Sequence, residues 1–179
     1  KDFCLWNLLL YVQKNNPNTP NLAAKLFAPG VRDLSRARRY WETALEVLGP
    51  RPCVYSGILV DRRAYSLDHF LPWSYVAHDL LWNVVPTTAS VNSAKGDRVP
   101  ELERYFGDFA RLQHEALRVV ATAARAKLVE DYTLLFRASS LEELWAVAFG
   151  RFEETLYDTI SPQVQIAENL GFVTGWRYG

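Results

Sequence analysis

Two adjacent residues in the middle of the chain, Asp68 and His69, pair a carboxylate with an imidazole, the side chain that ionises near neutral pH. They stand at the end of a short extended run, where neighbouring side chains point in different directions. Asn92 lies in the helix predicted to follow the next strand. A strand, loop, strand and helix can fold back so that these three side chains meet at one point.

Such a group of side chains suits cleavage of a phosphodiester. Asp68 and the amide oxygen of Asn92 are oxygen ligands of the kind that Mg²⁺ prefers. A cation held there stabilises charge on the phosphate and on the departing oxygen. His69 is suited to take a proton from the attacking water. An amide at Asn83 is expected to fix the loop and the orientation of the histidine by hydrogen bonds.

Further residues near this group are candidates for contact with phosphate. Lys95 and Arg98 lie near the end of the predicted helix and are expected to hold phosphate oxygens. His78 lies in the loop between the two strands, where either a phosphate contact or simple loop packing accounts for it. The arginines between Arg32 and Arg39 crowd one end of a helix, which fits a solvated face or a contact with the DNA backbone.

Helical periodicity and turn residues place this segment between helices. Helices are predicted over 2–15, where the helix is expected to be buried, and over 34–48. Extended chain is predicted over 53–55, 58–60, 64–68 and 81–85, and Pro86 is expected to stop the last of these segments. A further helix, capped by Thr87 or Thr88, is predicted to run to Lys95. After Pro100 the chain is predicted to be helical again. The tryptophans on apolar helix faces, Trp6, Trp41 and Trp145, are predicted to be core residues.

The pattern of Asp68-His69, Pro72, Asn83, Asn92 and Lys95 resembles the signature of HNH endonucleases, which have the ββα-metal fold. His69 and Asn83 are fourteen residues apart, and Asn83 and Asn92 nine. The run Asn-x-x-Lys-x-Asp-x-x-Pro that ends at Pro100 closely resembles the HNH module of RNA-guided type II CRISPR effectors. The pattern is also similar to stand-alone bacterial HNH proteins of phage defence and restriction. The resemblance spans Cys53 to Pro100.

This resemblance implies a role for each matching residue. Asp68 and Asn92 would be the ligands of Mg²⁺ or Mn²⁺, and His69 the general base. Asn83 would be the structural middle residue of the signature and, with Lys95, part of the catalytic set. The implied fold is α+β and mainly helical, with helices flanking a small ββα-metal core. The implied substrate is DNA.

Many HNH proteins carry two CxxC pairs that bind a structural zinc, and this chain departs from that pattern. The corresponding positions read Cys53-Val54-Tyr55-Ser56 and Thr88-Ala89-Ser90-Val91, so a four-thiolate zinc site is not possible and no structural zinc is expected. The helical flanks must then support the core. The expected organisation is an N-terminal flank over 1–52, the nuclease core over 53–100 and a C-terminal helical region over 101–179, all in one compact domain.

The charge of the chain is balanced overall but uneven along it. The formal net charge is zero, yet the charges are unevenly distributed. Residues up to 129 include 17 basic and 12 acidic side chains, whereas residues from 130 onward include 3 basic and 8 acidic side chains. The chain has two cysteines and no apolar run long enough to span a membrane, which favours a reducing, cytoplasmic location. It has no methionine and begins at Lys1, so we expect a piece of a longer polypeptide.

Three functional hypotheses follow. In the first, the chain is the nuclease module of a larger effector, either a guide-RNA-containing CRISPR complex or another anti-phage system. The module then depends on an attached or docked targeting subunit for its affinity for DNA. The second is a self-contained restriction-type nuclease. The third is an inactive HNH-derived module for protein interaction. DNA binding by the isolated chain at increasing salt separates the first two, and a cleavage assay decides the third.

Overall fold

The computed structural model describes residues 2–16, 22, 32–121 and 123–179, and within them the chain is mainly helical α+β, as predicted. The elements are α1 (Asp2–Asn15), α3 (Ser35–Leu48), β1 (Arg51–Pro52), β2 (Leu59–Val60), β3 (Ser66–His69), α4 (Trp73–Val76), η1 (Leu81–Asn83), β4 (Val84–Thr87), α5 (Ala89–Lys95), α6 (Leu102–Val120), η2 (Ala123–Leu128), α7 (Glu130–Phe136), α8 (Leu141–Trp145) and α9 (Phe149–Asn169).

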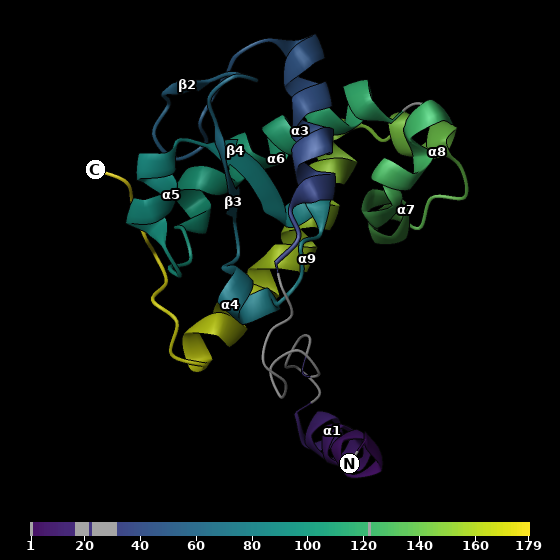
Figure 1. Cartoon of the computed structure of the whole chain (residues 1–179), viewed down its shortest axis with the longest axis vertical. Coiled ribbons are helices and arrows are strands. Elements are labelled where there is room, and N and C mark those ends of the chain that lie inside the picture. The colour runs from purple at the N-terminus through teal and green to yellow at the C-terminus, as the bar shows by residue number, and fades with distance from the viewer. Residues whose placement is uncertain (1, 17–21, 23–31, 122) are drawn as a thin grey trace.

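The centre of the molecule is a ββα unit made of β3, β4 and α5 (Figure 1). The two strands are antiparallel, with Ser66 opposite Thr87 and His69 opposite Val84. Thr88 caps α5 because its hydroxyl accepts a hydrogen bond from the backbone N–H of Val91 at 3.3 Å, which confirms one of the two predicted caps. Helix α5 packs against β3 and so stands over the strand that carries the candidate residues.

Three local predictions in this region are wrong. The segment Leu81–Asn83 is a 3-10 turn rather than a strand, and β4 runs through Pro86 to Thr87 instead of stopping there. Proline is tolerated because β4 pairs only with β3 and keeps one unpaired edge. Cys53 is not in a strand either: it opens the turn between β1 and β2, which Gly57 closes at a φ of 71°.

Three long helices hold the ββα unit from the side away from α5. Helix α3 packs against β4 and α6, and α6 packs against α9 (Figure 1). The indole N–H of Trp41, which is a core residue as predicted, donates to the carbonyl of Val84 at 2.9 Å. The side-chain amide of Gln113 donates to the same carbonyl at 3.0 Å and to that of Leu81 at 3.2 Å. The flanking helices therefore bond directly to the backbone of the second strand.

Helix α1 forms where it was predicted, but the prediction that it is buried is wrong. Phe3 and Trp6 are 79% and 59% exposed, and Tyr11 is exposed as well. Trp145 in α8 is also exposed rather than core; its ring lies against the Arg118 guanidinium and its N–H donates to the Arg118 carbonyl. No helix in the described ranges is long and apolar enough to cross a membrane.

The end of the chain returns to the ββα unit. The N–H of Val99 donates to the carbonyl of Val173 at 2.8 Å, and the N–H of Trp176 donates back to Val99 at 3.0 Å. The Arg177 guanidinium forms an ion pair with Glu101. The Trp176 ring packs edge-on against Tyr55, with 5.5 Å between ring centroids. The C-terminal segment therefore closes one side of the core.

Because of these contacts, we expect a chain truncated after Pro100 not to fold. The truncation removes Gln113 and Trp176 and exposes the aromatic core around Phe70, which stacks on Phe109 at 4.1 Å. Circular dichroism and proton NMR of chains 1–100 and 1–179 test this expectation. A cooperative melting transition and dispersed amide signals from the shorter chain would show that the ββα unit is self-supporting.

Candidate functional site

The candidate site lies at the end of β3, where the strand carries Asp68 and His69 on successive residues. Side chains alternate along a strand, so the two leave the end of β3 in different directions. Both are buried, with 3% and 1% of their surfaces exposed. Each is held by a separate set of polar partners, and these sets define the two halves of the site.

In the first half, the carboxylate of Asp68 forms an ion pair with Lys95. The Lys95 ammonium lies 3.1 Å and 3.2 Å from the two carboxylate oxygens and donates to the carbonyl of His69 at 2.6 Å. Lys95 is 0% exposed, and burial lowers the pKa of its ammonium while the nearby Asp68 opposes that shift. The structure thus places Lys95 as the counter-ion of Asp68 rather than at an open phosphate site.

Tyr55 is a third member of this half that the sequence pattern did not single out. Its hydroxyl donates to Asp68 Oδ2 at 2.7 Å. The ring packs among Phe70, Tyr105 and Trp176. Burial, with a further contribution from Asp68, raises the pKa of Tyr55 well above its ordinary value, so the hydroxyl stays protonated and donates. The only sequence signal for it is a tyrosine in the turn that follows Cys53.

Asn92 reaches the same side of β3 from α5. Its amide nitrogen donates to Ser66 Oγ at 2.9 Å and to the carbonyl of Leu67 at 3.1 Å. Ser66 and Asp68 are two residues apart on the strand and so share one face. With its nitrogen fixed by two hydrogen bonds, the amide presents its oxygen as the atom available for another partner.

The donor atoms of this half fit a hard divalent cation. A carboxylate and an amide oxygen match the preference of Mg²⁺ for a few protein oxygens completed by water and phosphate. Among the described residues no three His, Cys, Asp or Glu side chains gather as a metal-binding group, so an all-protein cage is not what these residues form. Asp68 and Asn92 are the residues that would hold the ion. In this structure the Lys95 ammonium balances the charge of Asp68.

In the second half, the imidazole of His69 lies between a carboxylate and a guanidinium. Its Nε2 is 2.8 Å from Asp79 Oδ1, and its Nδ1 is 2.6 Å from a guanidinium nitrogen of Arg32. A guanidinium only donates hydrogen bonds, so Nδ1 is the acceptor and the ring proton sits on Nε2, facing Asp79. Nδ1 is therefore the nitrogen with the lone pair that a general base needs.

Asp79 and Arg32 are contacts of His69 that the sequence pattern does not indicate. Asp79 lies in the loop between the strands, next to His78. Arg32 is the first arginine of the cluster before and within α3. Ten residues separate Asp79 from His69 and thirty-seven separate Arg32 from it, so neither contact follows from local spacing.

Asn83 fixes the loop that leaves His69. Its side-chain oxygen accepts from the N–H of Leu71 at 2.8 Å, and its amide donates to the carbonyl of Leu71 at 2.9 Å. Its backbone carbonyl accepts from the N–H of Phe70 at 2.7 Å. Asn83 is fully buried and contacts the backbone just after His69 rather than the imidazole, whose ring partners are Asp79 and Arg32.

The two residues expected at the margin of the site, Arg98 and His78, are both engaged within the protein. The Arg98 guanidinium bonds the carbonyls of Ala94 and Lys95 at the end of α5 and lies over the Trp176 ring at 5.8 Å. His78 packs edge-on against Trp82, and burial, with a smaller contribution from the neighbouring His69, lowers its pKa to about 4. His78 is thus neutral at pH 7 and brings no positive charge to a phosphate.

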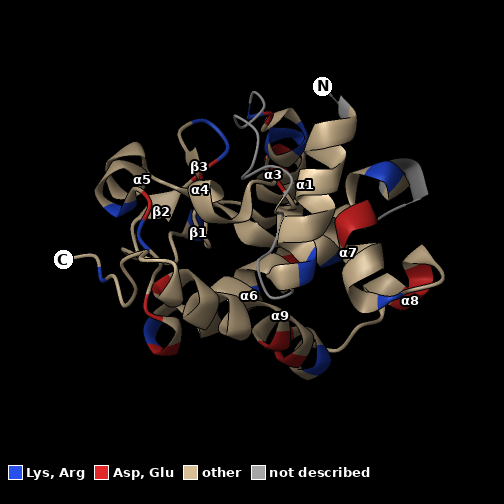
Figure 2. Ribbon diagram, turned by 90° about the horizontal axis from the view of Figure 1, so that it is seen from below, with Lys and Arg blue, Asp and Glu red and all other residues tan. Residues whose placement is uncertain are grey.

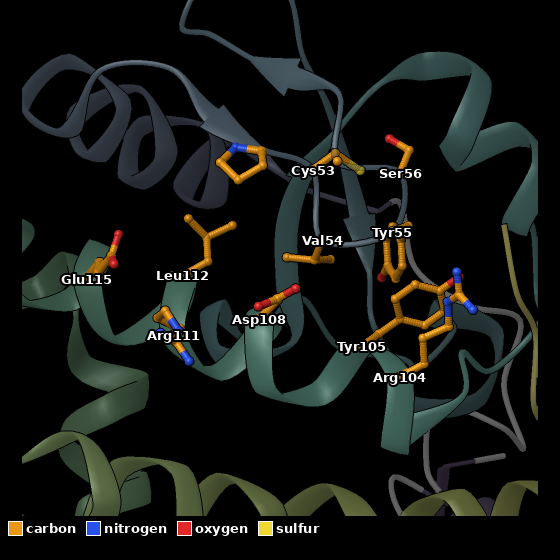
Figure 3. A pocket seen from close by; sticks show the side chains of 12 residues that line it. Cys53, Val54, Tyr55, Ser56, Arg104, Tyr105, Asp108, Arg111, Leu112 and Glu115 are labelled. Carbon is orange, nitrogen blue, oxygen red and sulfur yellow. The ribbon is translucent and has the colours of Figure 1, made fainter.

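A hollow of about 390 Å³ lies between the turn Cys53–Gly57 and α6, with Tyr55 in its lining (Figure 3). Its lining carries both signs of charge, including Arg104 and Asp108, and contains neither Asp68 nor His69. The Cys53 thiol in its wall is 3.1 Å from the Thr87 hydroxyl. The Tyr55 ring is shared between this hollow and the Asp68 half of the site.

Basic residues lie near the start of β3, whereas acidic residues lie on α7, α8 and α9 (Figure 2). Arg38 on α3 lies over the Tyr65 ring at 5.6 Å, and Arg63 is exposed in the connection before β3. The uneven charge along the sequence is therefore also uneven in space, with positive charge beside the strand that bears Asp68 and His69.

The comparison with protein families now identifies this unit. Residues 53–101 match the family described as HNH endonuclease. This segment is of the HNH type. The match covers β2 to β4 and α5, and it leaves Arg32, β1 and the helices α6 to α9 outside. Neither the curated proteins nor the solved structures gave a match. The HNH segment indicates nuclease activity and hence a nucleic acid as substrate, and HNH nucleases generally depend on a metal ion.

Proposed function

We propose that the chain hydrolyses phosphodiester bonds of DNA, with Mg²⁺ or Mn²⁺ bound by Asp68 and Asn92 and with His69 as the general base. The observation that carries the proposal is the position of His69 on the HNH segment, with Nε2 on Asp79 and the lone pair on Nδ1. This is the arrangement that lets an imidazole accept a proton while a carboxylate stabilises the resulting imidazolium.

Each residue has a distinct part in this proposal. His69 Nδ1 takes the proton of the attacking water, and Asp79 holds the ring and balances the positive charge that develops on it. Asn83 keeps the backbone after His69 in place. Tyr55 and Lys95 hold the Asp68 carboxylate. The bound cation supplies positive charge to the phosphate and to the departing oxygen.

For the biological setting, we propose the nuclease module of a larger effector, of a guide-RNA-containing CRISPR type or another anti-phage type. The zero net charge supports it, because a positive region offset by acidic helices gives limited affinity for DNA. The self-contained restriction-type nuclease stays as the alternative. An inactive interaction module is the less favoured candidate, because all residues of the signature are present.

We expect the chain to cut DNA with Mg²⁺ or Mn²⁺ and to lose that activity in EDTA, because the cation that Asp68 and Asn92 would hold would supply positive charge to the phosphate. End-labelled duplex DNA, single-stranded DNA and single-stranded RNA of one sequence are incubated with and without metal. Cleavage of RNA alone would overturn the proposed substrate, and equal cleavage in EDTA would overturn the metal ligands.

The same duplex also separates the two biological settings. Binding is measured by fluorescence anisotropy without divalent metal over a range of salt concentrations. A module delivered by a partner is expected to bind weakly and to lose what affinity it has as salt rises. Tight binding at physiological salt by the isolated chain would favour the self-contained nuclease.

A further inference from the structure

Arg32 differs from Lys95 and Arg36 because no described carboxylate forms an ion pair with it. Lys95 is paired with Asp68, and Arg36 is paired with Asp131. None of the ion pairs among the described residues includes Arg32, although its side chain is exposed and ends on the base nitrogen of His69. An exposed guanidinium that has no ion-pair partner among the described residues is suited to bind an anion such as phosphate.

The backbone next to Arg32 is tied to the same place. The N–H of Asp33 donates to Asp79 Oδ2 at 3.2 Å, while Asp79 Oδ1 accepts from His69. One carboxylate thus fixes both the imidazole and the segment that carries the guanidinium.

We propose that Arg32 is a catalytic residue of this nuclease, which binds the non-bridging oxygens of the scissile phosphate and, in doing so, leaves Nδ1 of His69 free for the attacking water. The proposal rests on the proposed function. It adds to the HNH segment a residue supplied by the N-terminal flank, twenty-one positions before the family match begins.

The exchange of partners is balanced. A hydrogen bond from the guanidinium to Nδ1 is replaced by one or two from the guanidinium to phosphate oxygens, a geometry that the planar arginine fork suits. Arg32 keeps its protons throughout. The proton that leaves water goes to Nδ1, and the water oxygen bonds to phosphorus as the bond from phosphorus to the departing oxygen breaks.

Arg32→Ala is expected to lower the single-turnover cleavage rate by about 10²- to 10³-fold, the usual effect of losing one donor to a charged transition state. DNA affinity should change only a few-fold and the melting temperature little, because the side chain is exposed. Arg151→Ala, which removes an exposed arginine of α9, is the matched control and should cleave normally. Arg32→Lys should fall between Arg32→Ala and the unchanged chain.

Chemical rescue tells a catalytic role from a structural one. Millimolar guanidinium ion should restore part of the activity of Arg32→Ala and none of that of His69→Ala. If Arg32→Ala cuts as fast as Arg151→Ala, or guanidinium has no effect on it, the proposal is wrong.

A second measurement keeps the inference separate from the proposed function. If the unchanged chain cuts nothing, the proposed function fails, and nitrogen-15 NMR of the His69 ring then decides the role of Arg32. Adding a short duplex without metal should shift the Nδ1 signal in the unchanged chain, because the guanidinium leaves it for phosphate. The signal in Arg32→Ala should not shift. An Nδ1 signal that the duplex leaves in place, or moves equally in both proteins, would overturn the inference.

Discussion

Replacing His69 with alanine is expected to lower the rate of DNA cleavage by about 10²- to 10⁴-fold, the range that general acid–base catalysis contributes. No other described side chain is placed to do the same work. His78 is the nearest histidine in sequence and faces Trp82 in the loop, and His114 is buried and bonded to the carbonyl of Val147. The proton of the attacking water therefore has no second imidazole to accept it.

The measurement is the single-turnover rate on a labelled duplex at saturating metal, with the melting temperature taken in parallel. His69 is buried, so His69→Asn is included to fill more of the space than alanine does. His114→Gln is the matched control, because glutamine keeps a donor for Val147 and lies outside the site. Cleavage by both His69 variants at the rate of this control would remove His69 from the mechanism.

Replacing Asp68 with asparagine is expected to affect stability as well as activity. The change removes the carboxylate ligand, and it leaves the buried ammonium of Lys95 without its counter-ion. Breaking a buried ion pair by removing one partner costs about 3–5 kcal/mol of unfolding free energy. Urea denaturation of Asp68→Asn and of the unchanged chain measures this cost, and the cleavage assay measures the loss of activity.

A double variant separates the two consequences. Asp68→Asn combined with Lys95→Met removes both charges and keeps a flexible apolar side chain in the place of the lysine stem. We expect it to regain most of the lost unfolding free energy while still failing to cut DNA. An Asp68→Asn protein as stable as the unchanged chain would show that the ion pair does not hold the core. A double variant that cuts DNA would show that Asp68 is not a metal ligand.

The parts of the site that the sequence predicted are those set by local spacing. The strand that ends in Asp68-His69, the cap at Thr88 and the helix that presents Asn92 lie within the expected segment. Lys95 follows Asn92 by three residues and so shares its face of α5. Its orientation toward β3 was thus readable from the sequence, but its pairing with Asp68 was not, because that depends on how deeply α5 packs.

The parts that the sequence did not predict depend on distant contacts. Tyr55 reaches Asp68 because the turn after β1 folds over β3, and Arg32, three residues before α3, reaches His69 at the end of that strand. The exposure of α1 has a different origin. Its apolar residues have helical spacing, but periodicity shows only that a helix forms and not whether another element covers it.

The most direct test of the account is cleavage of a supercoiled plasmid by the full chain with Mg²⁺, set beside the same reaction in EDTA and beside His69→Ala with Mg²⁺. We expect nicked or linear plasmid in the first reaction and intact supercoiled plasmid in the other two. Equal cleavage by His69→Ala, cleavage in EDTA, or intact plasmid in all three reactions with both Mg²⁺ and Mn²⁺ would contradict it.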